Sequence, residues 1–169
     1  MLGLIAAVAR VRLALPDILC RIYGPVDDPH YGERCRATVG ALGLERNVVF
    51  EGTTSDPAQA YQDSDVVVLC SVSEGFPYTV VEAMCSGRPV VATAVGGVPE
   101  ALNLPQLLVE PQNPQALANA VIALFRQTSA ERAAIGEDLR ERAVRLFSQQ
   151  RFLEEYRSLY MGVVHEPAA

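Results

Sequence analysis

The sequence predicts a doubly wound α/β fold, in which helices cover both faces of a parallel sheet. The 169 residues are 50% hydrophobic, enough to build one good-sized core. The expected strands are short and continuously apolar, as in the run D-V-V-V-L-C-S at residues 65–71, which is typical of a sheet buried on both faces. Helical patterns separate these runs, and that alternation is the order that a parallel sheet requires.

Turn residues divide the first half of the chain into elements. Gly24-Pro25 follows the first apolar run, and Gly43 is a natural C-cap for the helical pattern before it. The expected elements are a helix over residues 2–14, a strand over 18–23, a loop over 24–29, a helix over 31–43, a strand over 47–51 and a short helix over 57–62.

The second half continues the alternation and then becomes helical. Gly87 ends one helix, and Pro114 opens a run of three. Tyr156 and Tyr160 lie on the expected buried face of the last helix. The expected elements are strands over 65–71, 89–94 and 107–109, helices over 78–86, 98–102, 114–127, 130–146 and 148–161, and a turn at Gly96-Gly97.

Composition excludes several classes of function. The 14 basic residues are all Arg, against 20 acidic ones, and the net charge of −6 disfavours a nucleic-acid binder. The absence of Lys excludes Schiff-base chemistry and a P-loop. Four cysteines without a C-x-x-C pair favour a reduced, cytoplasmic protein, and the apolar run at residues 2–8 is too short for a membrane span.

Ligands of such sheets bind beyond the carboxyl ends of the strands, so the loops after the strands are the candidate sites. The richest of four such loops covers residues 71–79. Glu74 is expected at the mouth of the sheet, and Gly75 allows the backbone to pass close to a ligand. The other candidate loops cover residues 24–30, 52–56 and 95–99.

The helix after this loop begins with a pattern suited to an anion. Pro77 fits a first helical turn, which would leave the N–H groups of Tyr78 and Thr79 free for a phosphate. Glu82 lies about one and a half helical turns after Pro77, and its carboxylate could accept hydrogen bonds from a sugar diol. Alternatively, Glu74 caps the helix and Glu82 is only a solvated charge.

Together, Glu74 and Glu82 form a more specific signal. Seven residues separate them within S-E-G-F-P-Y-T-V-V-E-A-M-C-S-G-R-P-V-V-A-T-A-V-G-G-V-P-E, which resembles the E-x7-E region of retaining family 4 (group 1) GT-B glycosyltransferases. V-V-F-E-G at 48–52 and F-S-Q-Q-R-F-L-E-E-Y-R-S-L-Y at 147–160 follow the same order. The resemblance implies that residues 1–169 are a single Rossmann-like donor-binding domain, the C-terminal half of a GT-B fold with a helical C-terminal tail. Sucrose synthases and many enzymes of bacterial polysaccharide biosynthesis belong to this family.

The resemblance also implies roles for individual residues. Glu74, the candidate catalytic residue, would bind donor-sugar hydroxyls as a positioning group, and Glu82 would bind the ribose. Gly52 and Thr53 would lie near the base. The sugar and diphosphate would be held by the backbone of Gly75, Phe76, Pro77, Tyr78 and Thr79. The Thr79 hydroxyl could also donate a hydrogen bond to this part of the donor.

The implied donor is a UDP- or GDP-sugar, bound without a metal or another cofactor. The sequence has no Asp-x-Asp pair at a strand end. Retention in this family is usually attributed to front-face displacement, in which the leaving phosphate helps to deprotonate the acceptor. The developing charge on the diphosphate must then be met by dipoles and cations.

The sequence opens inside the helix that follows the family's first strand. The resemblance therefore implies that this strand, the Arg- and Lys-bearing loop after it and the acceptor domain are missing. We therefore expect an open gap between the strands at residues 18–23 and 66–70, and a fragment or split unit that is inactive alone. The alternative is a non-catalytic nucleotide-sugar-binding or scaffold module, and a GT-B epimerase is more distant. The missing G-x-G-x-x-G disfavours a dehydrogenase, and the missing Lys a phosphate-receiver domain.

Overall fold

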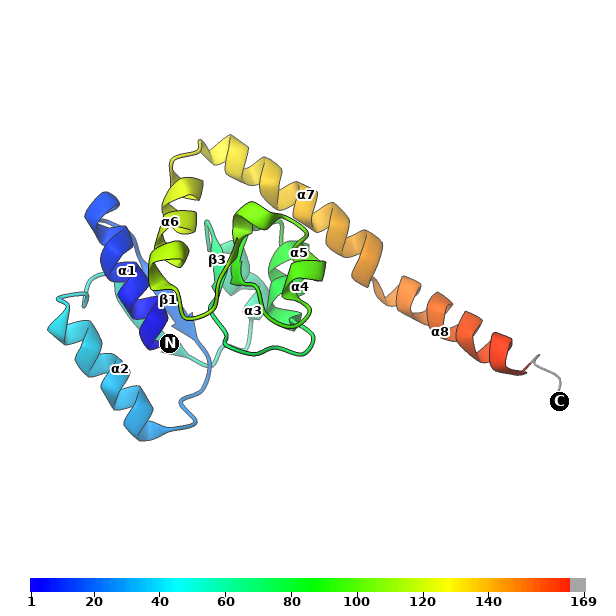
Figure 1. The fold of residues 1–169 in the computed structure, drawn as a ribbon, viewed down its shortest axis with the longest axis horizontal. Coiled ribbons are helices and arrows are strands. Elements are labelled where there is room, and N and C mark those ends of the chain that lie inside the picture. The colour runs from blue at the N-terminus through cyan, green and yellow to red at the C-terminus, as the bar shows by residue number, and fades with distance from the viewer. Residues whose placement is uncertain (165–169) are drawn as a thin grey trace.

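Strands and helices alternate along the chain in the computed structural model, which describes residues 1–164 (Figure 1). Every element expected from the sequence is present, with ends that differ by a few residues. The helices are α1 (Leu2–Ala14), α2 (Pro29–Ala41), α3 (Pro57–Gln62), α4 (Tyr78–Cys85), α5 (Val98–Leu102), α6 (Pro114–Phe125), α7 (Ser129–Phe147) and α8 (Gln149–Val164), with a 3₁₀ turn at Pro105–Leu107. The strands are β1 (Cys20–Tyr23), β2 (Val48–Gly52), β3 (Val67–Leu69), β4 (Val90–Thr93) and β5 (Leu108–Val109).

Side-chain caps define where several helices begin. The Asp28 carboxylate accepts hydrogen bonds from the N–H groups of His30 (2.9 Å) and Tyr31 (3.2 Å), so α2 begins at Pro29. Asp56 caps α3 and Asn113 caps α6 in the same way, each followed by a proline. A proline in the first turn lacks only an N–H that would have no partner in the helix. These starts therefore follow from local sequence.

The strands form two separate parallel sheets. One pairs β1 with β2, and the other has the order β3-β4-β5. All four residues of β4 are buried. Helices α1 and α6 pack together on one face, and α4, with α7 behind it, covers the other (Figure 1). The doubly wound parallel α/β class is therefore confirmed.

Helix α1 connects two hydrophobic cores. Its buried Ile5 and Val8 pack into the core under β1 and β2. Ala7 and Val11 belong to the larger core around β4. Because one rigid helix contributes to both cores, it links the two sheets although no hydrogen bond is found between their strands within residues 1–164.

A groove of about 1450 Å³ lies between the edge strand β1 of one sheet and the edge strand β3 of the other. Its walls include β1 and β3, and apolar side chains of α1 and α6 such as Val11 and Val121 also line it. Within residues 1–164, β1 pairs only with β2 and β3 only with β4, so each strand has an unpaired edge. The expected gap between these two strands is present.

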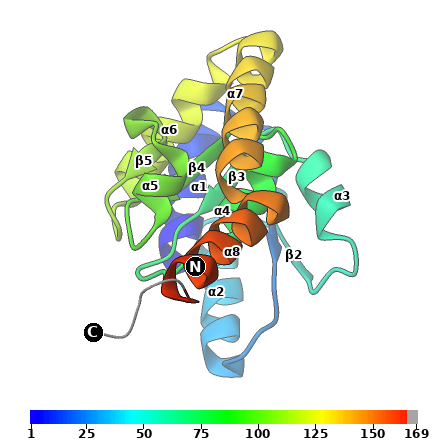
Figure 2. The same cartoon turned by 90° about the vertical axis from the view of Figure 1, so that its right-hand side faces the viewer.

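The C-terminal tail is helical, as expected, but the prediction of a buried face on its last helix is wrong. Helix α8 projects away from the body (Figures 1 and 2), and residues 149–162 are all exposed. Tyr156 and Tyr160 are 49% and 63% exposed. Their rings pack only along the helix, with centroids 5.8 Å apart. No described element covers this face.

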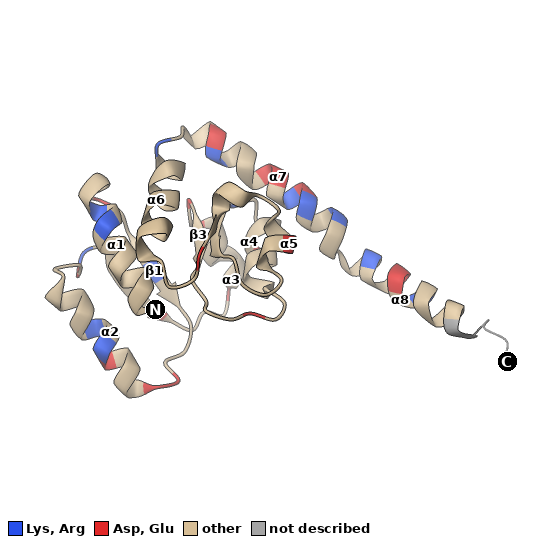
Figure 3. Cartoon of the chain, in the orientation of Figure 1, with Lys and Arg blue, Asp and Glu red and all other residues tan. Residues whose placement is uncertain are grey.

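Charged residues of both signs alternate along α7 and α8 rather than forming one basic surface (Figure 3). No helix within residues 1–164 is both long and apolar enough to cross a membrane.

Candidate functional site

The loop between β3 and α4 lies beyond the carboxyl end of β3 and rests on the turn that follows β4. The Thr93 hydroxyl at the end of β4 donates a hydrogen bond to the Ser71 carbonyl (2.6 Å). The Gly97 N–H donates to the Gly75 carbonyl (3.2 Å). Gly96 adopts a positive φ of 52° beside Glu74, where an added Cβ would lie 1.9 Å from the Glu74 carbonyl oxygen. The loop that follows β3 is therefore held in place by the end of β4 and the turn after it.

Aromatic contacts anchor the far end of this loop. Phe76 makes edge-to-face contacts with Tyr78 (centroids 5.0 Å apart) and with Phe147 of α7 (5.6 Å). Pro77 is fully buried next to it. Phe76 itself is still 47% exposed, so these contacts do not bury its ring fully.

The start of α4 differs from the sequence prediction in two ways. Pro77 is the N-cap rather than a residue of the first turn, and α4 begins at Tyr78. The Tyr78 N–H donates to the Phe76 carbonyl (3.0 Å), so the prediction that this group is free is wrong. The tight turn at Pro77 bends the chain back and brings the two groups together. The N–H of Thr79 has no backbone acceptor within residues 1–164, and it remains available at the positive end of the helix dipole.

Glu74 is a half-buried carboxylate in this loop. Within residues 1–164 it has no hydrogen bond or ion pair, and α4 has no side-chain cap. The alternative in which Glu74 caps the helix is therefore wrong. A half-buried carboxylate is costly to leave unpaired, which suits a group that binds a polar ligand.

Glu82 is exposed at the edge of the groove but is not simply solvated. Its Oε2 accepts a hydrogen bond of 2.8 Å from the Tyr61 hydroxyl of α3. The Thr79 side chain lies near the Tyr61 oxygen, and all three side chains line the groove. Partial burial, with the adjacent Glu82 carboxylate, raises the pKa of Tyr61 to about 12. The phenol therefore stays protonated and acts as a donor at physiological pH.

The sequence-predicted site residues form two adjacent groups. Thr53, Thr79 and Glu82 line the groove. Glu74 to Tyr78 make up the neighbouring loop. Gly52 ends β2 with a φ of 72°, and its carbonyl accepts from the Gly24 N–H (2.8 Å). It lies next to Thr53 in the chain but is outside the groove lining.

Sequence reasoning missed Tyr61 as a member of the site. No local pattern marks it, since it lies 21 residues before Glu82 and meets it only through the packing of α3 beside α4. Gly96 was expected only as part of a turn. The pair Gly96-Gly97 directly after a strand was the available signal that the backbone there passes close to another segment.

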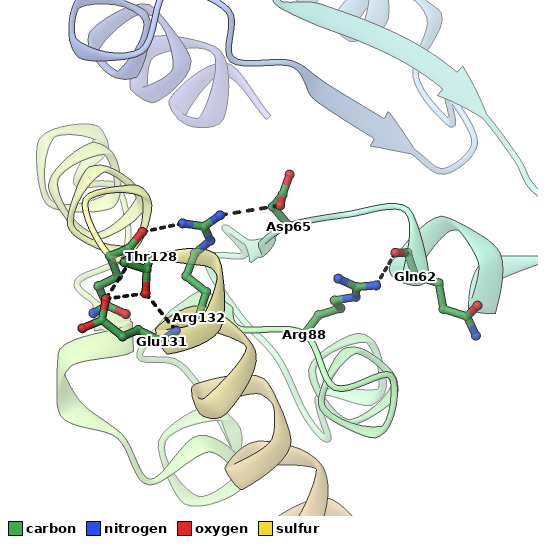
Figure 4. A network of polar contacts seen from close by, with 7 residues as sticks. Gln62, Asp65, Arg88, Thr128, Glu131 and Arg132 are labelled. Atoms are coloured by element: carbon green, nitrogen blue, oxygen red, sulfur yellow. Dashed lines mark hydrogen bonds and ion pairs between the residues drawn. The ribbon is translucent and has the colours of Figure 1, made fainter.

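Arginine contacts fix the elements that carry these residues (Figure 4). Arg88, which follows α4, donates to the Gln62 carbonyl at the end of α3. Arg132 of α7 lies 3.8 Å from Asp65, just before β3. Arg88 is thus directed toward α3. Within residues 1–164 no cluster of three His, Cys, Asp or Glu side chains could hold a metal ion.

Comparison with known proteins identifies the family. The sequence model of the family "Glycosyl transferases group 1" matches residues 1–127. The chain belongs to this family. It is 33% identical over 168 residues to the D-inositol 3-phosphate glycosyltransferase of Corynebacterium glutamicum, an alignment that covers 95% of this chain and 40% of the relative.

Solved structures of glycosyltransferases share the fold. Anabaena HepE, in complex with UDP and glucose, superposes with a TM-score of 0.81 at 28% identity over 92% of this chain and 44% of HepE. The C-terminal domain of a group 1 glycosyltransferase from Francisella tularensis superposes with a TM-score of 0.77 at 26% identity, covering 87% of this chain and 78% of that one. The chain therefore spans less than half the length of the corynebacterial relative and of HepE.

Proposed function

We propose that this chain is the donor-binding part of a retaining glycosyltransferase that moves a sugar from a UDP- or GDP-sugar to an acceptor. Family membership supports a transferase, and HepE is a relative of similar fold in complex with UDP and glucose. The observation that carries the proposal is the half-buried, unpaired carboxylate of Glu74, held by β3 and β4 beside the groove that Glu82 lines.

In this proposal the two carboxylates bind different parts of the donor. Glu82 accepts hydrogen bonds from the ribose diol, and Glu74 accepts them from hydroxyls of the sugar. The Thr79 N–H at the start of α4 and the backbone from Gly75 meet the diphosphate, where the helix dipole favours negative charge. Thr53 lies beside the base, with Gly52 setting the path of its loop. The sugar would then be transferred by front-face displacement, with Glu74 as a positioning group.

The groove supports the proposal that the domain lacks its first strand. A strand placed there would pair with the open edges of β1 and β3, which are otherwise an aggregation hazard. Met1 also lines the groove, so a strand in it could lead directly into α1. This strand, its cationic loop and an acceptor domain would come from the remainder of a longer or split enzyme. The in-frame sequence preceding Met1 tests this: a strand, a G-R-containing loop and a Lys are expected, and an unrelated sequence would contradict it.

A non-catalytic nucleotide-sugar-binding or scaffold module is the second candidate. One observation favours it: Arg21 is the only Arg among the described residues that line the groove, and it is paired with Glu51 at 3.1 Å. Without an unpaired cation nearby, the charge that develops on a leaving diphosphate is poorly stabilised. We therefore expect weak donor binding and little or no turnover from the chain alone.

Calorimetric titration with UDP, GDP and their sugars tests binding, and assays of sugar transfer and donor hydrolysis test activity. Measurable binding supports the donor site, whereas no binding by any of these ligands contradicts it. Turnover at rates typical of enzymes would show that the chain needs no further segment.

The proposal includes metal independence and a cytoplasmic location, both of which stay predictions. We expect EDTA to leave the affinity for UDP unchanged in the same titration. A loss of affinity that Mg²⁺ or Mn²⁺ restores would contradict metal-independent binding.

A further inference from the structure

Glu82 of α4 has one side-chain contact that the proposed function does not explain. Its Oε2 accepts the 2.8 Å hydrogen bond from Tyr61 of α3. No ion pair or second hydrogen bond to this carboxylate is found within residues 1–164. An exposed glutamate side chain without such a contact samples many rotamers, and ordering it on binding costs free energy.

Tyr61 is itself held in place. The residue is partly buried and packs against the larger core, and the Thr79 side chain lies near its oxygen. Arg88 donates to the carbonyl of the next residue, Gln62, and so ties the end of α3 to the segment after α4 (Figure 4). The phenol is therefore a fixed donor and not a second flexible group.

The geometry also leaves the carboxylate able to bind a ligand. A carboxylate has two oxygens with about four acceptor positions, and the phenol occupies one of them. The other oxygen of Glu82 has no hydrogen bond or ion pair within residues 1–164, and the residue lines the groove. A vicinal diol donates two hydrogen bonds, so an acceptor held in one rotamer binds it at a lower entropic cost.

We propose that Tyr61 is a positioning residue that holds the Glu82 carboxylate in the rotamer that accepts the ribose diol of the donor nucleotide. Tyr61 then contributes to discrimination between ribonucleotides and nucleotides without the diol, although it acts only through Glu82. This inference rests on the proposed function, because it assumes that Glu82 binds the ribose.

The test compares the affinities of UDP and 2′,3′-dideoxy-UDP for the wild-type chain, for Tyr61→Phe and for the matched control Tyr156→Phe. Tyr156 is exposed on α8 and lies outside the groove. Tyr61→Phe should weaken UDP binding about fivefold, the effect of one hydrogen bond, and leave dideoxy-UDP binding unchanged. Tyr156→Phe should match the wild type with both ligands. A purely structural role for Tyr61 would weaken both ligands equally and would overturn the inference.

The two hypotheses fail in different ways. If the wild-type chain binds neither nucleotide, or binds both equally, ribose recognition by Glu82 is wrong and the inference is overturned with it. If the wild type prefers UDP and Tyr61→Phe retains the full preference, only the role of Tyr61 is wrong.

A second variant keeps the test decisive if Tyr61→Phe does not fold. In Glu82→Gln the Tyr61 phenol should titrate at lower pH than in the wild type, as followed by phenolate absorbance, because the carboxylate that disfavours its ionisation is gone. The same variant should lose the preference for UDP. An unchanged titration together with an unchanged preference would overturn the inference.

Discussion

Gly96 lies directly against the carbonyl of Glu74, so closely that a Cβ at this position would be 1.9 Å from the oxygen and 2.8 Å from the carbon. The residue also has a φ of 52°, a conformation that L side chains adopt rarely. The candidate site loop and the turn after β4 therefore fit together only because this position has no side chain.

Gly96→Ala should consequently displace the loop that carries Glu74. We expect a loss of about 1–3 kcal/mol in the free energy of unfolding and at least about tenfold weaker binding of a UDP-sugar. Urea denaturation and calorimetry measure these effects. Gly162→Ala is the control, because a Cβ there meets nothing within 4 Å. Wild-type affinity in a folded Gly96→Ala chain would show that the position of this loop does not matter for binding.

Glu82→Ala should weaken UDP binding by at least about tenfold, because hydrogen bonds to a charged group are lost. The fold should survive, since Glu82 is exposed and its side chain contacts Tyr61 alone by a hydrogen bond within residues 1–164. Calorimetry and circular dichroism check both statements. Glu141→Ala, on the exposed surface of α7, is the matched control. An unfolded Glu82→Ala chain whose remaining folded fraction still binds UDP would assign Glu82 a structural role.

Stability should decrease at alkaline pH partly through Tyr61. Burial and the Glu82 carboxylate raise its pKa from 10.0 to about 12 in the folded chain. The unfolded chain therefore loses this proton first, and the stabilisation present below pH 10 is lost as the pH rises toward 12. Tyr61→Phe removes this contribution, so its melting temperature should fall less than that of the wild type between pH 9 and pH 11, an interval of about two units around the ordinary pKa. Parallel slopes in the two chains would contradict the shift. Cys20, whose pKa burial raises to about 11, is present in both chains and does not affect the comparison.

Removal of α8 should cost little stability. Residues 149–162 are exposed along their whole length, and the Phe152, Tyr156 and Tyr160 rings stack on one another instead of packing into the body. The free energy of unfolding of a chain that ends at Ser148 should therefore lie within about 0.5 kcal/mol of that of the full chain, as expected for changes away from the core. Urea denaturation measures this difference, and a lower melting temperature on truncation would show that α8 stabilises the body.

Local sequence was sufficient to predict the element order, but the helix expected at residues 31–43 begins earlier, at Pro29. The local signal for this start was present in the sequence. Asp28 and Asp56 each precede a proline, and such caps depend only on residues within one helical turn. The turn at Pro77 was predicted less well. A proline fits both the first turn and the position before it, and the fold decided between them by burying its ring and directing the Tyr78 N–H to Phe76.

The sequence by itself determined the α/β class, the site loop after β3 and the two carboxylates, because hydrophobic period, turn residues and motif spacing are properties of neighbouring positions. Only the tertiary structure decided what surrounds them. The Tyr61–Glu82 hydrogen bond, the contact of Gly96 with Glu74 and the groove between β1 and β3 each join segments far apart in the chain. Such contacts arise from the packing of helices and the pairing of strands, which depend on the whole core and not on any one segment.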